Sequence, residues 1–214
     1  MRFEEARRRL ITLPDPLPAG PHALDPVAIV EPGEVPPWAR RPAGEPPRDA
    51  AVLVLIYPGA DREAHLVLIE RPAGDHRHAG QVSFPGGAAD PGDDFPVGTA
   101  LREAAEEVGL DAEAAGVEVI GRLGTVDVRV SGFLLVPIVA VAARDPALTP
   151  DPREVAAILR VPVRHFLPPA PIEIVEADRD GWRLRYGAFP VGEHRIWGAT
   201  ARVLGQLGAV LGEG

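Results

Sequence analysis

Three glutamates stand close together near the middle of the chain. Glu103, Glu106 and Glu107 are spaced so that an α-helix would place all three on one face. Their repulsion would destabilise a bare helix by roughly 0.2–0.5 kcal/mol for each like-charged pair. A divalent cation removes this repulsion, and carboxylate oxygens are ligands that suit Mg²⁺ or Mn²⁺. An ion held there could neutralise a bound diphosphate, activate a water molecule and stabilise the charge that develops during hydrolysis.

The residues around these glutamates decide between a metal site and a plain charged surface. Charge runs usually form a solvated helix face, and the three residues alone allow that interpretation. Upstream, Gly86 and Gly87 permit a close approach of the backbone to a phosphate or a metal ion. Downstream, Gly109 is placed to end the helix directly after the last carboxylate. We therefore expect a metal site on a helix from Val97 to Val108. Its core-facing side is expected to consist of Val97, Leu101, Ala104, Ala105 and Val108, with the glutamates roughly opposite.

Strands and further helices must hold this helix in place. Two apolar runs, Ala51–Tyr57 and His65–Glu70, flank a Pro-Gly turn and predict a strand pair. The segment 72–98 is rich in glycine and proline, and we expect a functional loop there. The other expected elements are strands at Val117–Leu123 and Gly132–Ala142 and helices at Arg153–Leu159 and Ile196–Leu211. This mixed order indicates an α/β or α+β sandwich.

The first fifty residues differ in character from the rest of the chain. Met1–Leu10 predicts a short amphipathic helix with its apolar residues on one side. Proline and glycine are dense from Pro14 to Pro47, which favours an arm that wraps the surface in extended and turn conformations. We therefore expect residues 1–50 to form a helix and a proline-rich arm that pack on one catalytic domain of residues 51–214.

Composition and charge narrow the classes of function. The chain has 214 residues, a formal net charge of −9 and no cysteine. The acidic balance argues against binding to nucleic acid or to an anionic membrane. The lack of cysteine excludes disulfides, thiolate metal sites and cysteine nucleophiles. The longest apolar run, Phe133–Ala143, contains Pro137 and is too short to span a bilayer. No targeting signal stands out at Met1–Leu10, so the expected location is the cytoplasm.

The segment Arg102–Leu110 resembles the second half of the Nudix box, G-x5-E-x7-R-E-U-x-E-E-x-G-U, in which U is aliphatic. The matching residues are Arg102, Glu103, Glu106, Glu107, Gly109 and Leu110, with Ala104 as a small occupant of a U position. In the first half of the box, Asp93 has the required spacing from Gly87, whereas Asp94 has the required spacing to Arg102. Either aspartate can therefore stand for the first glutamate of the box.

The Nudix resemblance implies an α/β fold, namely an α/β/α sandwich with a mixed β-sheet, and an enzyme that hydrolyses phosphorus anhydrides with Mg²⁺ or Mn²⁺. In that family, the residues matching Glu103 and Glu107 bind the metal ions, and the residue matching Glu106 supports them. The Gly87 carbonyl commonly joins this site, and the residue matching Arg102 orients the carboxylates. The predicted metal set is Gly87, Glu103, Glu106 and Glu107. The predicted catalytic set is Arg102, Glu103 and Glu106.

A second resemblance lies upstream, in the segment Leu68–Gly87. It is similar to the additional motif of the coenzyme A diphosphatase branch of the same family, L-L-T-x-R-S/A-x3-R-x3-G-x3-F-P-G-G. The matching residues are Arg71, Gly80, Phe84, Pro85, Gly86 and Gly87, whereas Ile69, Pro72 and His76 differ from the pattern. The tail segments Val161–Val163, Phe166-Leu167 and His194–Ala201 are also similar to this branch, and Trp197 is expected in the core.

Cationic side chains in this upstream segment could attract the phosphates of a substrate despite the negative net charge. Arginine suits bidentate contact with phosphate. The same side chains could instead pair with nearby acids such as Glu70 or Asp75. The predicted substrate-binding set is Arg71, Arg77, His78, Gln81 and Ser83.

The branch resemblance implies hydrolysis of the diphosphate linkage of coenzyme A, or of its derivatives, to 3′,5′-ADP and 4′-phosphopantetheine. The alternatives are a Nudix hydrolase of ADP-ribose, a dinucleotide or a nucleoside triphosphate, and a non-catalytic nucleotide-binding sensor. The sequence leaves open the free, oxidised or acylated form of coenzyme A and the choice between Mg²⁺ and Mn²⁺. It also leaves open the general base, which is Glu103 or a loop carboxylate such as Glu154, and the oligomeric state, a homodimer included.

Overall fold

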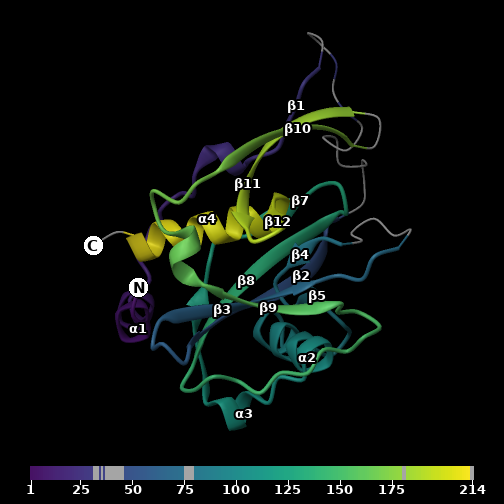
Figure 1. Ribbon diagram of the computed structural model, residues 1–214. Helices are drawn as coiled ribbons and strands as arrows, with labels where there is room; N and C mark the ends of the chain where they lie inside the picture. The colour runs from purple at the N-terminus through teal and green to yellow at the C-terminus, as the bar shows by residue number, and fades with distance from the viewer. Residues whose placement is uncertain (31–33, 35, 37–45, 75–79, 180–181, 213–214) are drawn as a thin grey trace.

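The computed structural model describes residues 1–30, 34, 36, 46–74, 80–179 and 182–212, which contain helices and two β-sheets (Figure 1). The larger sheet contains β2 (Arg48–Pro58), β3 (Ala64–Glu70), β4 (Val82–Ser83), β5 (Gly86–Ala88), β6 (Val117–Arg122), β7 (Val126–Val128), β8 (Phe133–Ala142) and β9 (Ala157–Pro162). Its strand order is β4-β3-β2-β8-β6, with β5 paired to β2, β7 to β8 and β9 to β3. The β2–β8 pair is parallel and the other pairs are antiparallel, so the sheet is mixed as predicted.

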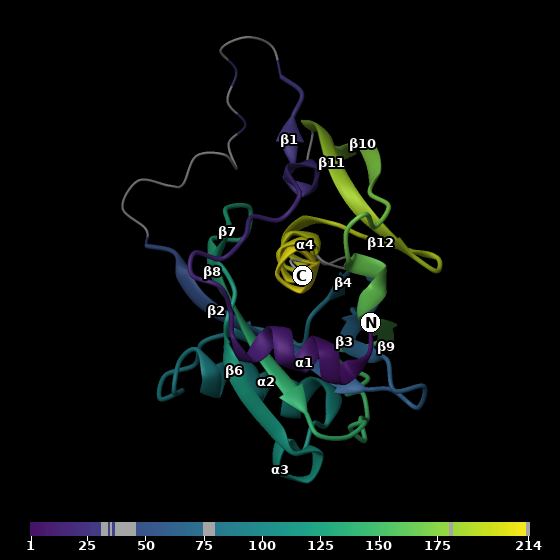
Figure 2. The same ribbon diagram turned by 90° about the vertical axis from the view of Figure 1, so that its left-hand side faces the viewer.

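The smaller sheet lies beside the larger one and was not predicted from the sequence. It contains β1 (Val27–Ala28), β10 (Glu173–Arg179), β11 (Trp182–Val191) and β12 (His194–Ile196). Its order is β1-β11-β10, and β12 pairs with the far end of β11. The strand β12 leads directly into α4 (Gly198–Gly212), which lies between the two sheets in both views (Figures 1 and 2).

Helices cover both faces of the larger sheet, and alternate residues of β2 point to opposite sides. Val54 and Ile56 belong to a buried cluster that also contains side chains of α1 (Phe3–Ile11) and α4. Leu53 and Leu55 belong to a second cluster, with apolar residues of α2 (Val97–Val108). The predicted α/β/α sandwich is therefore confirmed. Strands buried on both faces read as continuous apolar runs, which is why β2 and β8 stand out in the sequence.

The helix α2 has the predicted bounds, but its buried face differs from the prediction. Ala100, Ala104 and Val108 are buried, whereas Ala105 is exposed. Glu107 is buried as well, with only 1% of its surface exposed. The helix is therefore rotated toward Glu107 relative to the expected core face. The left-handed backbone of Gly109, with φ 64°, ends the helix as expected.

Another correction concerns the predicted helix Arg153–Leu159. These residues instead form a turn followed by β9, which pairs antiparallel with β3 from Ala157 opposite Glu70 onward. The apolar residues of this short stretch fit both periodicities, and the free edge of β3 decides in favour of a strand. A short helix, α3 (Ala112–Ala115), and two 3₁₀ turns, η1 (His22–Leu24) and η3 (Val163–Phe166), complete the described elements.

The N-terminal helix α1 is tied to the rest of the molecule by packing and by polar contacts. Its residues Phe3, Ala6 and Leu10 are buried in the cluster shared with α4. The terminal amino group contacts the Glu63 carboxylate at 2.7 Å. In the part of the chain that the structure describes, no helix is long and apolar enough to cross a membrane.

Candidate metal and diphosphate site

The backbone of β5 brings two glycines against the carboxylates of α2. The Gly86 amide donates a hydrogen bond to Glu107 Oε2 at 2.8 Å. Gly86 has φ 151°, and a Cβ there would lie 2.4 Å from the Ala51 carbonyl oxygen, so no other residue fits without a shift. A Cβ on Gly87 would lie 2.5 Å from Glu103 Oε1. The absence of side chains at these two positions lets the strand approach both glutamates.

Glu107 is the most deeply placed carboxylate of the site. Burial raises its pKa to about 7, although the Gly86 hydrogen bond and the charge of Arg71 act in the opposite direction. Arg71 Nη2 lies 3.7 Å from Glu107 Oε1. Burial also raises the pKa of Glu103, against the effect of the Arg102 guanidinium. Both carboxyl groups therefore lie where a nearby positive charge stabilises the ionised form.

Arg102 joins most of the acidic groups of the site. Its Nη1 lies 3.0 Å from Glu103 Oε1 and 2.9 Å from Glu106 Oε2. Its Nη2 lies 3.0 Å from Asp93 Oδ2 and donates a hydrogen bond to the Ala88 carbonyl at 3.2 Å. Arg102 therefore contacts the carboxylates that it is expected to orient.

Of Asp93 and Asp94, Asp93 is the one whose side chain bonds to α2, at Thr99 and Arg102. Besides Arg102, its carboxylate accepts hydrogen bonds from the Thr99 hydroxyl at 2.8 Å and from the Asp90 amide at 3.0 Å. The hydrogen bond from Arg102 is the largest of several effects that hold the pKa of Asp93 well below its usual range. Asp94 is exposed, and its carbonyl accepts from the Gly98 amide. Of the two aspartates, the one with the required spacing from Gly87 is therefore the one that contacts Arg102.

The donor set is suited to a divalent metal ion. Glu103 and Glu107 offer carboxylate oxygens beside the backbone of Gly87, and hard cations such as Mg²⁺ prefer oxygen ligands. Glu106 lies at the edge of the site, with 58% of its side chain exposed. Within the described residues, no three acidic or histidine side chains already converge on one point. The guanidinium groups of Arg71 and Arg102 occupy the positions beside the carboxylates.

The structure describes three of the five predicted substrate-binding residues, namely Arg71, Gln81 and Ser83. The Arg71 amide donates to the Gln81 carbonyl at 3.0 Å, which closes the base of the loop after β3. Ser83 lies on β4, and its hydroxyl is buried without a hydrogen-bond partner in the described part of the chain. Arg77 and His78, like His76 and Asp75, lie outside the described residues. Arg71 lies beside Glu107, whereas the alternative considered from the sequence was a pairing with Glu70 or Asp75.

The loop 149–154 is a neighbour of the site that sequence reasoning identified only through Glu154. The Thr149 amide donates to the Val108 carbonyl, and the Asp151 amide to the Glu107 carbonyl, both at 2.9 Å. These bonds fix the loop against the end of α2. The charge of Glu154 acts on both Glu103 and Glu107, where it raises the pKa. Glu154 belongs to this loop, its amide donating to the Asp151 carbonyl at 3.0 Å, and it stays a candidate base.

The chain is similar in sequence to proteins of one known family. A family model described as the NUDIX domain matches residues 47–180. A Photorhabdus laumondii protein named uncharacterized Nudix hydrolase NudL is 38% identical over 160 residues, which cover 75% of this chain and 83% of that protein. A Cronobacter sakazakii protein of the same name is 37% identical over 166 residues, covering 78% and 84%. Among solved structures, a Nudix hydrolase from M. smegmatis, RenU, has a TM-score of 0.47 and 25% identity, covering 56% of this chain and 74% of that one.

Proposed function

Because the chain belongs to the NUDIX domain family, we propose that it hydrolyses the diphosphate linkage of coenzyme A or a coenzyme A derivative. The chain is a Nudix hydrolase, an enzyme that acts on phosphorus anhydrides, and enzymes of this kind use divalent metal ions. The specific substrate is our proposal. It is supported by the residues Arg71 and Gly80–Gly87, which are similar to the coenzyme A diphosphatase motif.

One contact carries the proposal further than sequence similarity does. Arg71 is the first arginine of that motif. Its Nη2 atom lies 3.7 Å from Oε1 of Glu107 on α2. A guanidinium at this position can contact two phosphate oxygens of a diphosphate that lies beside the carboxylates. The motif and the box therefore meet at one place, as a single diphosphate-binding site requires.

We assign roles to the residues as follows. Glu103 and Glu107 would hold the metal ions together with the Gly87 carbonyl, and Glu106 would support them from the edge. Such an ion, when bound, offsets the charge of the diphosphate and acidifies a water molecule. Arg102 keeps the Glu103 and Glu106 carboxylates oriented. Gln81 and Ser83 are kept, with Arg71, Arg77 and His78, as substrate-binding residues.

The reaction requires a base near the attacked phosphorus. A water oxygen forms a bond to one phosphorus while the bond from that phosphorus to the bridging oxygen breaks, and the base accepts the water proton. Glu103 and Glu154 are the two candidates. The products are 3′,5′-ADP and 4′-phosphopantetheine, or its acylated form. In this proposal residues 51–214 form the catalytic domain, and residues 1–50 form a helix and an arm that pack on it.

Product identification tests the proposed substrate. Purified protein is incubated with Mg²⁺ or Mn²⁺ and with coenzyme A, its disulfide, an acyl-coenzyme A, ADP-ribose, a dinucleotide and a nucleoside triphosphate, and products are identified by mass spectrometry. We expect the highest kcat/KM with a coenzyme A compound. A higher kcat/KM with ADP-ribose, the dinucleotide or the triphosphate would still indicate a Nudix hydrolase. It would overturn the proposal that coenzyme A is the substrate.

A further inference from the structure

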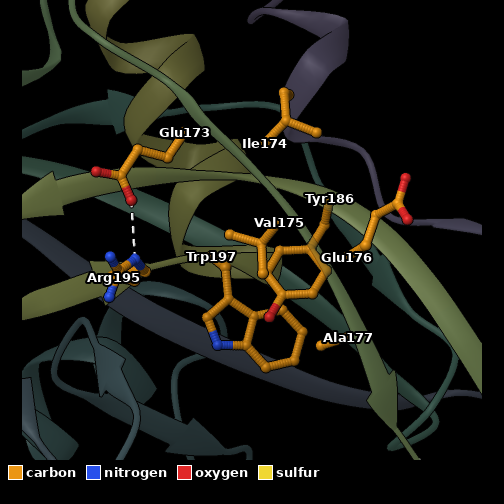
Figure 3. A pocket seen from close by; sticks show the side chains of 8 residues that line it. All are labelled: Glu173, Ile174, Val175, Glu176, Ala177, Tyr186, Arg195 and Trp197. Atoms are coloured by element: carbon orange, nitrogen blue, oxygen red, sulfur yellow. Dashed lines mark hydrogen bonds and ion pairs between the residues drawn. The ribbon is translucent and has the colours of Figure 1, made fainter.

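A hollow on the smaller sheet has charged groups that are already paired. It has a volume of about 630 Å³ and is lined by Glu173–Ala177 of β10, Tyr186 of β11, Arg195 of β12, and Trp197 directly after β12 (Figure 3). Trp197 was expected in the core, but it lines this hollow and is only partly buried. Arg195 Nε lies 2.8 Å from Glu173 Oε2, and Arg183 Nη2 lies 2.8 Å from Glu176 Oε2. Each charged group of the lining therefore has a partner on the sheet itself.

The helix α2, in contrast, buries two polar side chains. Leaving tyrosine aside, Thr99 and Glu107 are the two polar residues that are buried in the described part of the chain. Glu107 belongs to the carboxylate site, whereas Thr99 lies in the first turn of the helix and is fully buried. The Thr99 hydroxyl donates to Asp93 Oδ2 at 2.8 Å. A buried hydroxyl is costly without a partner, and the branched threonine side chain has few allowed rotamers. This bond therefore holds the Asp93 carboxylate against α2.

The Asp93 carboxylate in turn fixes one edge of the Arg102 guanidinium. Asp93 Oδ1 accepts from Arg102 Nε at 3.1 Å, and Asp93 Oδ2 accepts from Arg102 Nη2 at 3.0 Å. Such a two-point contact sets the plane of the guanidinium as well as its distance. The remaining nitrogen, Nη1, lies 3.0 Å from Glu103 Oε1. Because the guanidinium is planar and rigid, the edge held by Asp93 determines where Nη1 meets Glu103.

Asp93 departs from the Nudix box in a way that gives the Thr99 hydroxyl a role. The box has a glutamate where this chain has the shorter Asp93, and eight residues rather than seven separate Asp93 from Arg102. Asp93 Oδ2 is shared by three donors, namely the Thr99 hydroxyl, the Asp90 amide at 3.0 Å and Arg102 Nη2. The amide comes from the loop before α2 and the hydroxyl comes from the helix. Together these two donors hold the carboxylate with both oxygens toward Arg102.

From these contacts we propose that Thr99 is a positioning residue of the metal site. Its hydroxyl orients Asp93, and Asp93 keeps Arg102 where the guanidinium holds Glu103. The inference rests on the proposed function in one respect, namely that Glu103 is a metal ligand, and it does not depend on the substrate. Without the hydroxyl, the Asp93 carboxylate can rotate, and Glu103 is no longer held in place before a metal ion binds. Ordering a side chain on binding costs entropy, so the metal affinity should fall.

NMR of the metal-free protein tests whether Thr99 orients Arg102. The Arg102 Nε–H group gives a ¹⁵N–¹H signal, which is assigned by its loss in Arg102→Lys. Thr99→Val keeps the size of the side chain without the hydroxyl, and Thr99→Ser keeps the hydroxyl without the methyl group. We expect Thr99→Val to shift the Arg102 signal and to speed its exchange with water, whereas Thr99→Ser should leave the signal near its wild-type position. Thr99→Ala, which brings no new atom near Asp93, should shift the signal as Thr99→Val does.

An unchanged Arg102 signal in Thr99→Val and Thr99→Ala would overturn the proposal. Circular dichroism of each variant shows that the comparison is made on folded protein.

Calorimetry with Mn²⁺ and no substrate measures the consequence for the metal site. We expect the affinity to fall about fivefold in Thr99→Val and to stay within about twofold of the wild type in Thr99→Ser, since hydrogen bonds to ionised acceptors are the stronger ones. A role in packing alone predicts the reverse, because serine leaves a cavity and valine fills it. Equal losses in the two variants would therefore overturn the proposal.

A double variant shows whether Thr99 acts through Asp93. Thr99→Val has little left to disturb once Asp93→Asn has removed the charge that holds Arg102. We therefore expect the double variant to bind Mn²⁺ within about twofold of Asp93→Asn alone. Losses that multiply would show that the two residues act independently, and they would contradict the proposed order of contacts.

Kinetics separate failure of this inference from failure of the proposed function. If the wild type hydrolyses coenzyme A while Thr99→Val changes neither the Arg102 signal nor the Mn²⁺ affinity, the function stands and the positioning role is wrong. If coenzyme A is not hydrolysed but Thr99→Val changes both, the positioning role stands and the proposed substrate is wrong. We expect hydrolysis by the wild type. In Thr99→Val at saturating Mn²⁺ we expect a lower kcat with KM within about twofold, since a residue that positions a metal ligand acts on turnover more than on substrate binding.

Discussion

At the scale of single residues, the site depends on one buried acid. Glu107 is 1% exposed, accepts a hydrogen bond from Gly86 and has Arg71 as its cationic neighbour. A buried carboxylate is costly to ionise unless positive charge and hydrogen bonds compensate. Metal binding requires the ionised form. A cation bound beside Glu107 would therefore strongly favour the ionised form of this buried carboxylate.

Glu107→Gln separates metal binding from folding. The amide can still accept the Gly86 hydrogen bond, but it carries no charge, so we expect kcat/KM to fall at least about 100-fold, equivalent to about 2.7 kcal/mol. Metal affinity, measured by calorimetry, should fall with it. Glu106→Gln is the matched control, because Glu106 lies at the exposed edge, and its loss should be smaller. Unchanged metal affinity in Glu107→Gln would show that the assigned metal set is wrong.

Because of Glu107, we expect the stability of the protein to depend on pH when a chelator keeps it free of metal. Burial raises the pKa of Glu107 to about 7 in the folded state, whereas a glutamate in the unfolded chain has a pKa of about 4.3. The folded state then binds the proton more tightly, so this group makes the protein more stable as the pH falls from about 8 to 5. Urea unfolding of wild type and Glu107→Gln across this range should show the gain in the wild type only. Parallel curves for the two proteins would contradict the prediction.

Asp93 and Asp94 form a natural matched pair. Asp93 bonds to Arg102 and Thr99, whereas Asp94 is exposed and its side chain has no described role in the site. Asp93→Asn should release the Arg102 guanidinium and lower kcat/KM about tenfold. Asp94→Asn should stay within about twofold of the wild type. Steady-state kinetics with saturating metal distinguish the two, and the reverse ranking would assign the box position to Asp94.

At the scale of elements, β5 approaches β2 too closely to hold a side chain at Gly86. A Cβ on Gly86 would lie 2.4 Å from the Ala51 carbonyl, so Gly86→Ala must displace β5 from β2. We expect a loss of about 1–3 kcal/mol in the free energy of unfolding, together with loss of activity. Gly92→Ala is the control, because Gly92 also has a positive φ, 100°, but open space around it. Equal losses in denaturant unfolding would mean that backbone conformation, rather than contact with β2, sets the requirement for glycine.

The elements also show which parts of the structure a sequence can predict. The bounds of α2 follow from a strong helical pattern and a terminal glycine, both of which are local. The strand β9 depends on the edge of β3, more than eighty residues earlier, and its own pattern gave the wrong prediction of a helix. The choice of Asp93 depends on contacts with Thr99 and Arg102 that spacing alone does not reveal. The burial of Glu107 likewise depends on the backbone of β5, which no helical pattern encodes.

At the scale of the whole molecule, the layers bring distant parts of the chain to one site. The helix α2 covers one face of the larger sheet, while α1 and α4 cover the other (Figure 2). Through β12 and β4, α4 also connects the smaller sheet to the segment that carries Gly86. In the smaller sheet, β10 has no buried residue among 173–178, and it contains the charged residues Glu173, Glu176 and Asp178. Its membership of a sheet follows from the pairing with β11, which a single-strand pattern does not reveal.

Substitutions at two adjacent positions of α1 measure how much this helix contributes to the free energy of unfolding. Leu10 is fully buried against the cluster shared with α4, whereas Ile11 is 52% exposed. Leu10→Ala removes packing and leaves a cavity, so we expect the free energy of unfolding to fall by about 2–5 kcal/mol. Ile11→Ala should change it by less than about 0.5 kcal/mol.

Denaturant unfolding shows whether α1 unfolds together with the larger sheet. The transitions are followed by circular dichroism and by tryptophan fluorescence. If α1 belongs to the same cooperative unit as the sheet, the two probes give coincident single transitions in Leu10→Ala, shifted together to lower denaturant. Activity at low denaturant should then be retained, because α1 lies across the sheet from α2. Separate transitions, or an unchanged midpoint in Leu10→Ala, would mean that the helix docks on a domain that is already stable without it.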